Sequence, residues 1–517
     1  MSKGRNKILL LIIPAAVLLI VGYLYVRAMR QLPVGPIRTT ISKETTHILG
    51  PVNEDGTVNY MAYLNAKHSK GVTRENNAAI PMIDIFGPDW LRKDTGGKIY
   101  KILNISPPSA GQKHLTSLED HVSETLSKED RSTFWDKNSK LPIHETKLWN
   151  AKQYPLVAGW LEDNKGALDA ILVAMERPRY YIPAVSYDED ECIATLVRPD
   201  VHPPMSASRA LTARAMLKVE SGDMTGAWAD LTAARRLARR VASGYTAIEN
   251  LLGVWMERKA FSAIREMAGS GKLTSEQAQA FLTDMQSLEP MPDLLDNVNE
   301  CERFMMLDMV MLIARTTHQE GLGEAMGDIQ SGEQKLQSNT RSLEWDRILV
   351  RINPWYDNVA AAARHKVFKD RSVALADHDR RLTELSEELY ESNTSLTTVW
   401  NHLFDPTEAI GNLLIGVFMN SHASGILQRD MARAEGDLSV VTMALAAYRA
   451  EKKVYPDKLS QLSPGYLKKV PDDLFIDKPF FYERTGKGYL LYSVGGNMKF
   501  EGKKEDQWTG DIVVRVE

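Results

Sequence analysis

The chain has 517 residues, of which 44% are hydrophobic and 25% charged, proportions typical of a globular protein rather than a disordered one. Its formal net charge of −4 gives no reason to expect nucleic acid as a partner. Two cysteines, Cys192 and Cys301, are too few for a zinc framework or a disulfide-stapled fold, and whether they pair stays open. Because the length exceeds one ordinary core, we expect two or three domains.

The N-terminus contains a run of nineteen residues without a charge, Ile8 to Val26, preceded by three basic residues. A membrane span needs about 20 apolar residues, so this run is long enough to be a transmembrane helix. A cleaved secretory signal is the alternative, but signal cores are shorter and end at a small-x-small site. Because this run ends in Tyr-Leu-Tyr-Val-Arg-Ala-Met-Arg, we predict an uncleaved membrane anchor over residues 1–30.

The charges around the anchor slightly favour a cytoplasmic N-terminus, and no second apolar run reaches span length. We therefore expect a single-pass protein of a bacterial inner membrane, with the bulk of the chain outside the cytoplasm. Residues 31–54 are predicted to be a spacer, and residues 55–203 a domain of short helices and loops. In this domain Val58 to Lys67 has helical periodicity, and Thr73 is predicted to cap a helix that ends at Ile85.

Residues 204–435 read as a helical domain. Its first two helices, Met205 to Glu220 and Thr225 to Val241, flank the turn Gly222-Asp223, and small or apolar residues recur on the second: Ala227, Leu231 and Ala234. Small residues let the two helices of a hairpin approach closely. The hairpin resembles one tetratricopeptide repeat. No second copy follows at a period of 34, although about three repeats are needed for a solenoid.

Further helices are predicted over five ranges: Tyr245 to Ala268, Ser275 to Leu288 with Thr274 as its cap, Leu294 to Thr317, Trp355 to Tyr390, and Ala409 to Ala447. A basic edge lies near the end of the predicted hairpin, formed by Arg235, Arg236, Arg239 and Arg240. Most such edges are solvated faces, and we expect the same here.

Residues 436–517 differ from the rest of the chain. A helix-like run, Leu438 to Glu451, precedes three segments with strand periodicity: Pro479 to Tyr482, Gly488 to Gly495, and Asp511 to Val516. Thr485 to Gly488 reads as a hairpin loop. This arrangement resembles the C-terminal domain of the major pseudopilin of type II secretion. It implies a small α+β domain with an antiparallel sheet, in which Ile512, Val514 and Val516 face the helix and Val513 and Arg515 face outward.

The pseudopilin resemblance also implies a calcium site in the loop before the last strand. Asn497, Asp506 and Asp511 match the family's ligand positions loosely, whereas three lysines of the same loop oppose a cation: Lys499, Lys503 and Lys504. We expect the loop to be held by turns and by Asp511 capping the last strand, with calcium as the open alternative.

Across most of the chain, phrases such as Gly71-Val72-Thr73, Gly222-Asp223 and Asn353-Pro354-Trp355 resemble those of large, uncharacterised, membrane-anchored bacterial proteins. That resemblance implies a shared architecture and no known activity. The expected fold is mostly α, with an N-terminal transmembrane helix, a large helical body and the small C-terminal α+β domain.

The sequence contains no Gly-x-Ser-x-Gly elbow, Walker loop, dinucleotide fingerprint or His-Glu-x-x-His motif. We therefore assign no catalytic or cofactor-binding residue. The leading hypothesis is an interaction or scaffold protein, with protein partners and an association with a secretion or envelope assembly. Two alternatives stay open: an envelope hydrolase with a dispersed active site, and a periplasmic peptide binder that uses the tetratricopeptide-like hairpin.

The anchor has a direct test. Ile8 to Val26 should hold the full-length protein in bacterial membranes through an alkaline carbonate wash, because burying the apolar run stabilises the inserted state. Deletion of residues 1–30 should release the protein into the soluble fraction. Recovery of the full-length wild-type protein in the soluble fraction after the wash, or a mature N-terminus beyond Arg30, would disprove the anchor.

Overall fold

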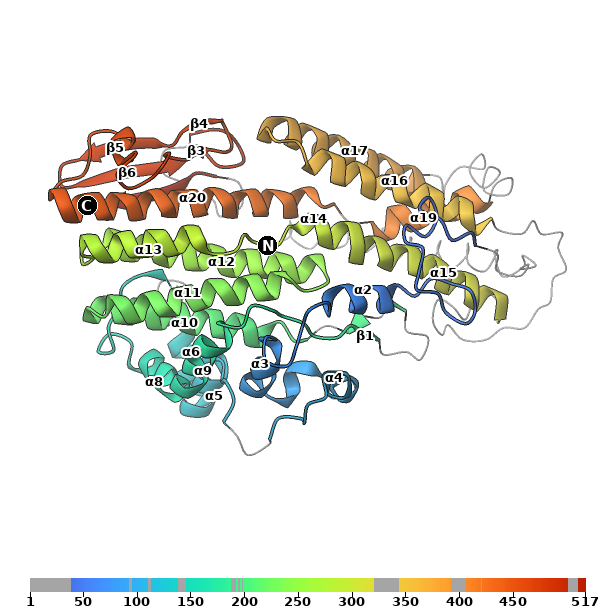
Figure 1. Cartoon of the computed structure of the whole chain (residues 1–517), viewed down its shortest axis with the longest axis horizontal. Helices are drawn as coiled ribbons and strands as arrows, with labels where there is room; N and C mark the ends of the chain where they lie inside the picture. Colours follow the sequence, from blue (N-terminus) through green and yellow to red (C-terminus); the bar gives the residue numbers. More distant parts are fainter. Residues whose placement is uncertain are drawn as a thin grey trace.

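The computed structural model describes residues 39–92, 95–109, 113–137, 146–186, 192–193, 196–197, 199–319, 344–391, 406–419, 421–500 and 510–517. These ranges form a mostly helical protein with a small antiparallel sheet near the C-terminus, which confirms the expected fold class in this coarse form (Figure 1). The predicted anchor, residues 8–26, lies outside them. Among the helices that the structure describes, none has the length and apolarity needed to cross a membrane.

The first part of the fold consists of short elements: α2 (Tyr60–His68), α3 (Ala79–Phe86), η1 (Pro88–Leu91), α4 (Gly96–Leu103), α5 (Leu118–Thr125), α6 (Lys128–Lys137), α8 (Pro155–Asp163), α9 (Lys165–Ala174), β1 (Val185–Ser186) and β2 (Leu196–Val197). The helix predicted after Thr73 starts only at Ala79, so that prediction was wrong at its start. Thr73 and Asn76 hydrogen bond each other within a turn, whereas the Asn77 amide donates to Tyr181 O at 2.8 Å and thus joins distant segments.

The central body is an antiparallel helical bundle that contains α10 (His202–Ser221), α11 (Met224–Ala242), α12 (Ala247–Gly269) and α13 (Ser275–Ser287). The predicted hairpin is present. Gly222 ends α10 with φ +91°, and the Asp223 side chain caps α11 by accepting from Gly226 N at 2.8 Å. The α11 and α12 backbones approach so closely that a Cβ at Gly253 would lie 2.3 Å from Ala238 O.

The next part of the chain forms a second group of helices: α14 (Leu294–Asn297), the π-helical segment η3 (Val298–Glu302), α15 (Arg303–Gln319), α16 (Trp345–Ala363), α17 (Phe368–Glu391) and α19 (Pro406–Phe418). Two long helices of the sequence prediction are each divided. The Trp355–Tyr390 helix breaks after Ala363, where the Arg371 guanidinium binds the carbonyls of His365 and Lys366.

The predicted Ala409–Ala447 helix divides after Phe418, because its two halves pack on different partners. The first half, α19, packs on α16 and α17, whereas α20 (Ala423–Lys452) packs on α12 and α13. Periodicity in the sequence detects apolar faces but not a change of packing partner, which explains the error.

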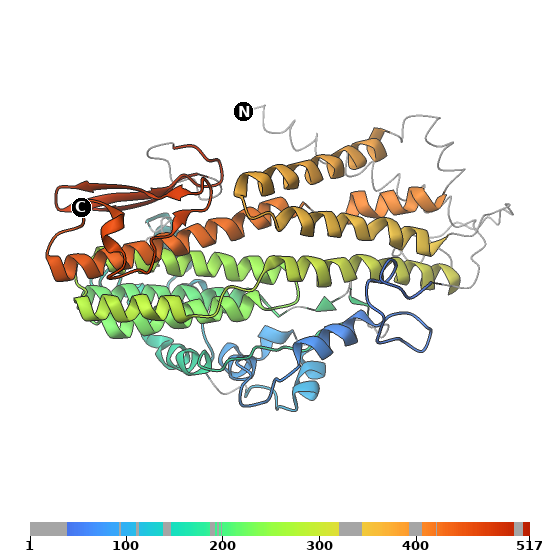
Figure 2. The same ribbon diagram turned by 45° about the horizontal axis from the view of Figure 1, so that its top comes forward.

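The C-terminal part contains η5 (Leu459–Leu462), a short ladder of β3 (Asp472–Asp473) with β4 (Lys478–Pro479), and an antiparallel sheet of β5 (Phe481–Thr485), β6 (Gly488–Ser493) and β7 (Ile512–Val516) in that order. The sheet lies over the C-terminal half of α20, opposite α12 and α13 (Figure 2). Ile512, Val514 and Val516 are buried and Arg515 is exposed, which confirms the predicted alternation. Gly486, with φ +53°, lies in the predicted hairpin loop between β5 and β6.

Two clusters of buried hydrophobic residues support these elements. The larger one joins α3, the bundle of α10 to α13, most of α20 and the sheet. The smaller one joins α2 with α14 to α19 and the start of α20. The predicted boundary at residue 436 lies inside α20, whose 30 residues contribute to both clusters.

Leu231 offers a test of the hairpin, because it is fully buried between the helices of the bundle. Leu231→Ala should lower the free energy of unfolding by about 2 to 5 kcal/mol, since it removes apolar contacts and leaves a cavity. Denaturant unfolding measures the change. Ile248→Ala, at a position that is 54% exposed on α12, should change it by less than about 0.5 kcal/mol. Equal changes in the free energy of unfolding for the two substitutions would contradict the burial of Leu231 in the bundle.

Candidate functional site

A cleft of about 390 Å³ lies where four distant segments of the chain converge. They are the end of α2 with the loop after it (residues 64–72), residues 178–180, the turn from α11 to α12 (residues 239–245), and the connector from α13 through α14 (residues 289–300). The volume is within the range of ligand-binding clefts, about 300 to 1,000 Å³.

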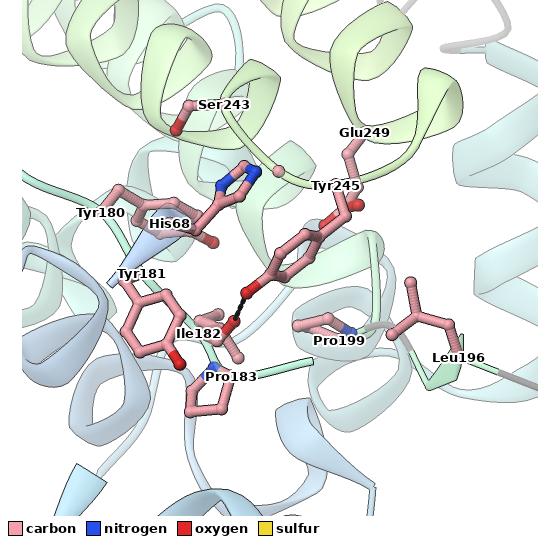
Figure 3. A pocket seen from close by; sticks show the side chains of 11 residues that line it. His68, Tyr180, Tyr181, Ile182, Pro183, Leu196, Pro199, Ser243, Tyr245 and Glu249 are labelled. Atoms are coloured by element: carbon pink, nitrogen blue, oxygen red, sulfur yellow. Dashed lines mark hydrogen bonds between the residues drawn. The ribbon is translucent and has the colours of Figure 1, made fainter. Parts of the chain in front are cut away.

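The floor of the cleft continues into a smaller pocket with an aromatic lining, which contains His68, Tyr180, Tyr181 and Tyr245 (Figure 3). The His68 and Tyr245 rings lie 4.5 Å apart between centroids, and the Tyr245 hydroxyl donates to Ile182 O at 3.0 Å. The turn that carries Tyr245 is held from the connector, because the Asn297 amide donates to the carbonyls of Gly244 and Tyr245 at 2.7 and 2.9 Å. The floor is therefore a fixed surface.

The ring groups of the floor are uncharged at neutral pH. Burial, with a smaller contribution from the Lys67 charge, lowers the pKa of His68 to about 4. Burial likewise raises the pKa of the Tyr180 and Tyr245 hydroxyls, and the Glu249 carboxylate adds to both shifts. A neutral imidazole both donates and accepts a hydrogen bond. These three side chains are suited to hydrogen bonding a ligand rather than to exchanging protons near neutral pH.

A serine, a histidine and a carboxylate line the same pocket, but they do not form a catalytic triad. The Ser243 hydroxyl donates to Arg240 O at 2.7 Å, and Glu249 accepts from Thr246 N and Oγ1 at 2.9 and 2.8 Å as part of the cap of α12. Within the described ranges no hydrogen bond connects the His68 ring to either side chain. Nucleophilic catalysis requires the base to contact the nucleophile and the third group to orient the base.

Most of the charges that line the cleft are sorted by segment. Arg239 and Arg240, at the end of α11, also line it, and they contact the carboxylates of Glu257 and Glu289. Three basic side chains come from α2, its following loop and residues 178–180: Lys67, Lys70 and Arg179. Four acidic ones come from the connector: Glu289, Asp293, Asp296 and Glu300. The two groups meet in an ion pair between Lys67 and Glu300. The cleft is therefore bipolar, with a basic side and an acidic side.

The arginine edge of α11 is largely not the solvated face that we expected. Arg235 and Arg239 are buried and bind opposite oxygens of Glu257 at 3.0 and 2.6 Å. Arg236 pairs with Glu176 at the surface, and Arg240 contacts Glu289 at 3.4 Å. Periodicity did not reveal this, because the carboxylate that neutralises the edge lies on α12.

The structure describes two of the three candidate calcium residues. The Asn497 side chain accepts from Lys499 N at 2.9 Å, and Asp511 is buried just before β7 beside Asp473. Asp506 lies outside the described residues. In the part of the chain that the structure describes, no group of three or more His, Cys, Asp or Glu side chains is arranged to hold a metal ion. The calcium site stays a prediction.

Comparisons with protein families, with curated proteins and with solved structures found no match to this chain. The site is therefore defined by its geometry alone. Sequence reasoning did not find the cleft, because its lining comes from four segments without a shared motif. The one local signal is the Glu289-Pro290-Met291-Pro292-Asp293 stretch, whose prolines end α13 and turn the chain toward the cleft.

Beside the sheet, Asp437 of α20 provides a test by pH. Burial, together with the charge of Asp473, raises its pKa from 3.8 to about 6, although Arg433 opposes the shift. The folded state therefore holds this proton more tightly than the unfolded state, and the stabilisation is lost as the pH rises from about 4 to about 6. Asp437→Asn should raise the free energy of unfolding at pH 7 by on the order of 2 kcal/mol, allowing for partial solvent exposure.

At pH 3.5 the same substitution should have little effect, because aspartic acid is then neutral in the folded state and mostly neutral in the unfolded state. Denaturant unfolding at the two pH values measures the difference. Glu483→Gln, on the exposed face of β5, removes the same charge and should change stability by less than about 0.5 kcal/mol at either pH. An equal increase in the free energy of unfolding for Asp437→Asn at both pH values would show that the effect is not electrostatic.

Proposed function

We propose that the chain is a membrane-anchored interaction protein whose cleft receives a segment of another polypeptide. Its anchor is Ile8 to Val26, and the helical body is held outside the cytoplasm of a bacterial cell. The observation that carries the proposal is the bipolar, aromatic-floored cleft. The proposed partner belongs to a secretion or envelope assembly, as the pseudopilin-like arrangement of the last 82 residues implies.

The packing of the helical body supports a scaffold role. One side of α20 packs on α12 and α13, and its other side packs on the sheet. The sheet and the bundle therefore share one hydrophobic cluster. The segments around the cleft are fixed by hydrogen bonds between distant residues, among them Asn297 to Gly244 O and Asn77 to Tyr181 O. A preformed cleft loses less conformational entropy on binding than a mobile one.

The chemistry of the cleft favours binding over catalysis. His68 is neutral and its ring contacts that of Tyr245 at a tilt of 45°, Ser243 is hydrogen bonded to the backbone, and Glu249 caps a helix. The hydrolase alternative stays open, with Ser243 of this pocket as the candidate nucleophile although no triad surrounds it. It would be supported if the purified protein cleaved esters or peptides and lost that activity in Ser243→Ala.

Site-specific photo-crosslinking in intact cells tests the proposal. A benzophenone amino acid in place of Lys70, at the rim of the cleft, should give a discrete crosslinked polypeptide, because a bound segment would lie within reach of the side chain. The same probe in place of Val373 of α17, which is 64% exposed and outside the cleft lining, is the control. The Lys70 product should be absent from the Val373 sample on immunoblots.

Identical products at the two positions, or no product at Lys70 in membranes that contain the full-length protein, would count against the proposed function. The partner in the crosslinked band is identified by mass spectrometry of the excised product.

A further inference from the structure

The two sides of the cleft carry exposed charges that no other residue of the described ranges neutralises. Lys70 and Arg179 are exposed on the basic side and Asp296 is exposed on the acidic side. None of these three side chains forms an ion pair with another described residue. By contrast, Lys67 pairs with Glu300, and Asp293 pairs with Arg429 at 2.9 Å, so these charges are already compensated.

Arg179 lies beside the loop that carries Lys70. Gly71 follows Lys70 directly, and a Cβ built on Gly71 would lie 3.8 Å from the Arg179 guanidinium. The positive φ of +73° at Gly71 turns the loop after α2 so that its backbone runs beside Arg179. Lys70 and Arg179 therefore both belong to the basic side of the cleft, here called the basic patch, which is suited to a carboxylate.

The acidic side is placed by the connector. Asp293 caps α14 by accepting from Leu295 N at 3.1 Å, which sets Asp296 in the first turn of that helix on the cleft side. Glu289 lies on the same side. Its carboxylate contacts Arg240 at 3.4 Å, and its backbone carbonyl accepts from Arg239 at 2.7 Å. Asp296 and Glu289 offer carboxylates to an ammonium or guanidinium group.

From this arrangement, and on the basis of the proposed function, we propose that the cleft selects an extended polypeptide segment of mixed charge. Its acidic side chain binds Lys70 and Arg179, its basic side chain binds Asp296 and Glu289, and its backbone amide lies over the neutral floor of His68 and Tyr180. The neutral imidazole can accept from a peptide N–H or donate to a peptide carbonyl.

Other ligand classes fit the cleft less well. A polyanion such as nucleic acid would meet the four carboxylates of the connector, and a polycation would meet the basic patch. A charged cleft that repels like charge excludes wrong partners as well as binding the right one. The mixed-charge peptide is complementary to both sides at once.

Fluorescence anisotropy with the full-length protein in detergent tests the proposal. The probes are end-blocked, fluorescein-labelled hexapeptides of Gly and Ser that carry either one Glu and one Lys, two Glu, or two Lys, with the charges at varied spacing. The mixed-charge set should contain peptides that bind about tenfold more tightly than any peptide of the other two sets. That binding should weaken as the salt concentration rises, because both charge contacts are exposed to solvent.

Charge reversal provides the decisive comparison. Lys70→Glu should shift the preference toward the two-Lys peptides, and Asp296→Lys toward the two-Glu peptides. The double variant restores one charge of each sign and should regain the mixed-charge preference. Lys101→Glu, on the exposed face of α4 and outside the cleft, makes the same change in net charge and should leave the preference as in the wild type.

An unchanged preference in both single variants, or equal binding of all three peptide sets by the wild type, would overturn the proposal. Circular dichroism confirms that each variant is folded. A crosslinked partner at Lys70 together with peptide binding that ignores charge would refute only the mixed-charge selection. Failure of both experiments would refute the proposed function as well.

Discussion

The body of the protein depends on three buried carboxylates, each held by two cations across a helix–helix contact. Asp230 of α11 binds Arg214 and Lys218 of α10, at 2.6 and 2.7 Å. Glu257 of α12 binds Arg235 and Arg239 of α11, and Glu435 of α20 binds Arg258 and Arg265 of α12. Burial raises the pKa of Glu257, but the two arginines outweigh that effect and the pKa is lowered overall. Removing one partner of such a pair typically lowers the free energy of unfolding by about 3 to 5 kcal/mol, because the remaining charge is left buried without a partner. A shift of one helix along its neighbour would separate the partners in the same way, so the pairs restrict the register of each helix.

The same ionic contacts determine the shape of the cleft. The Arg239 guanidinium, held by Glu257, also donates to Glu289 O at 2.7 Å, and this bond fixes the start of the acidic connector against the end of α11. Arg240, one residue further, donates to Arg177 O at 3.1 Å and so holds the segment that carries Arg179. The end of α11 therefore positions both sides of the cleft. A change in the register of α11 and α12 would move the basic and acidic groups relative to each other.

Local signals in the sequence predicted much of the secondary structure. The Gly222-Asp223 turn, the Thr274 cap of α13 and the alternation of Ile512, Val514 and Val516 were all found, because each depends on residues close in the chain. The divided helices and the paired arginines of α11 were missed, since they depend on the helix that packs opposite. The cleft was missed for the same reason: Lys70, Arg179 and Asp296 are more than a hundred residues apart and share no motif.

The cleft also lies where the two hydrophobic clusters meet, which explains why it is not filled by side chains. Leu64 of α2 and Leu294 of the connector belong to the smaller cluster, whereas Val241 of α11 and Met285 of α13 belong to the larger one, so both cores border the cleft. The segments between them are short turns and prolines, such as Pro290 and Pro292, which cannot contribute a continuous apolar face. α20 bridges the clusters, because Ile426 packs in the smaller and Met431 in the larger. A continuous helix thus joins the two cores that border the cleft. A rigid spacing of opposite charges is what discrimination between peptides of different charge pattern requires.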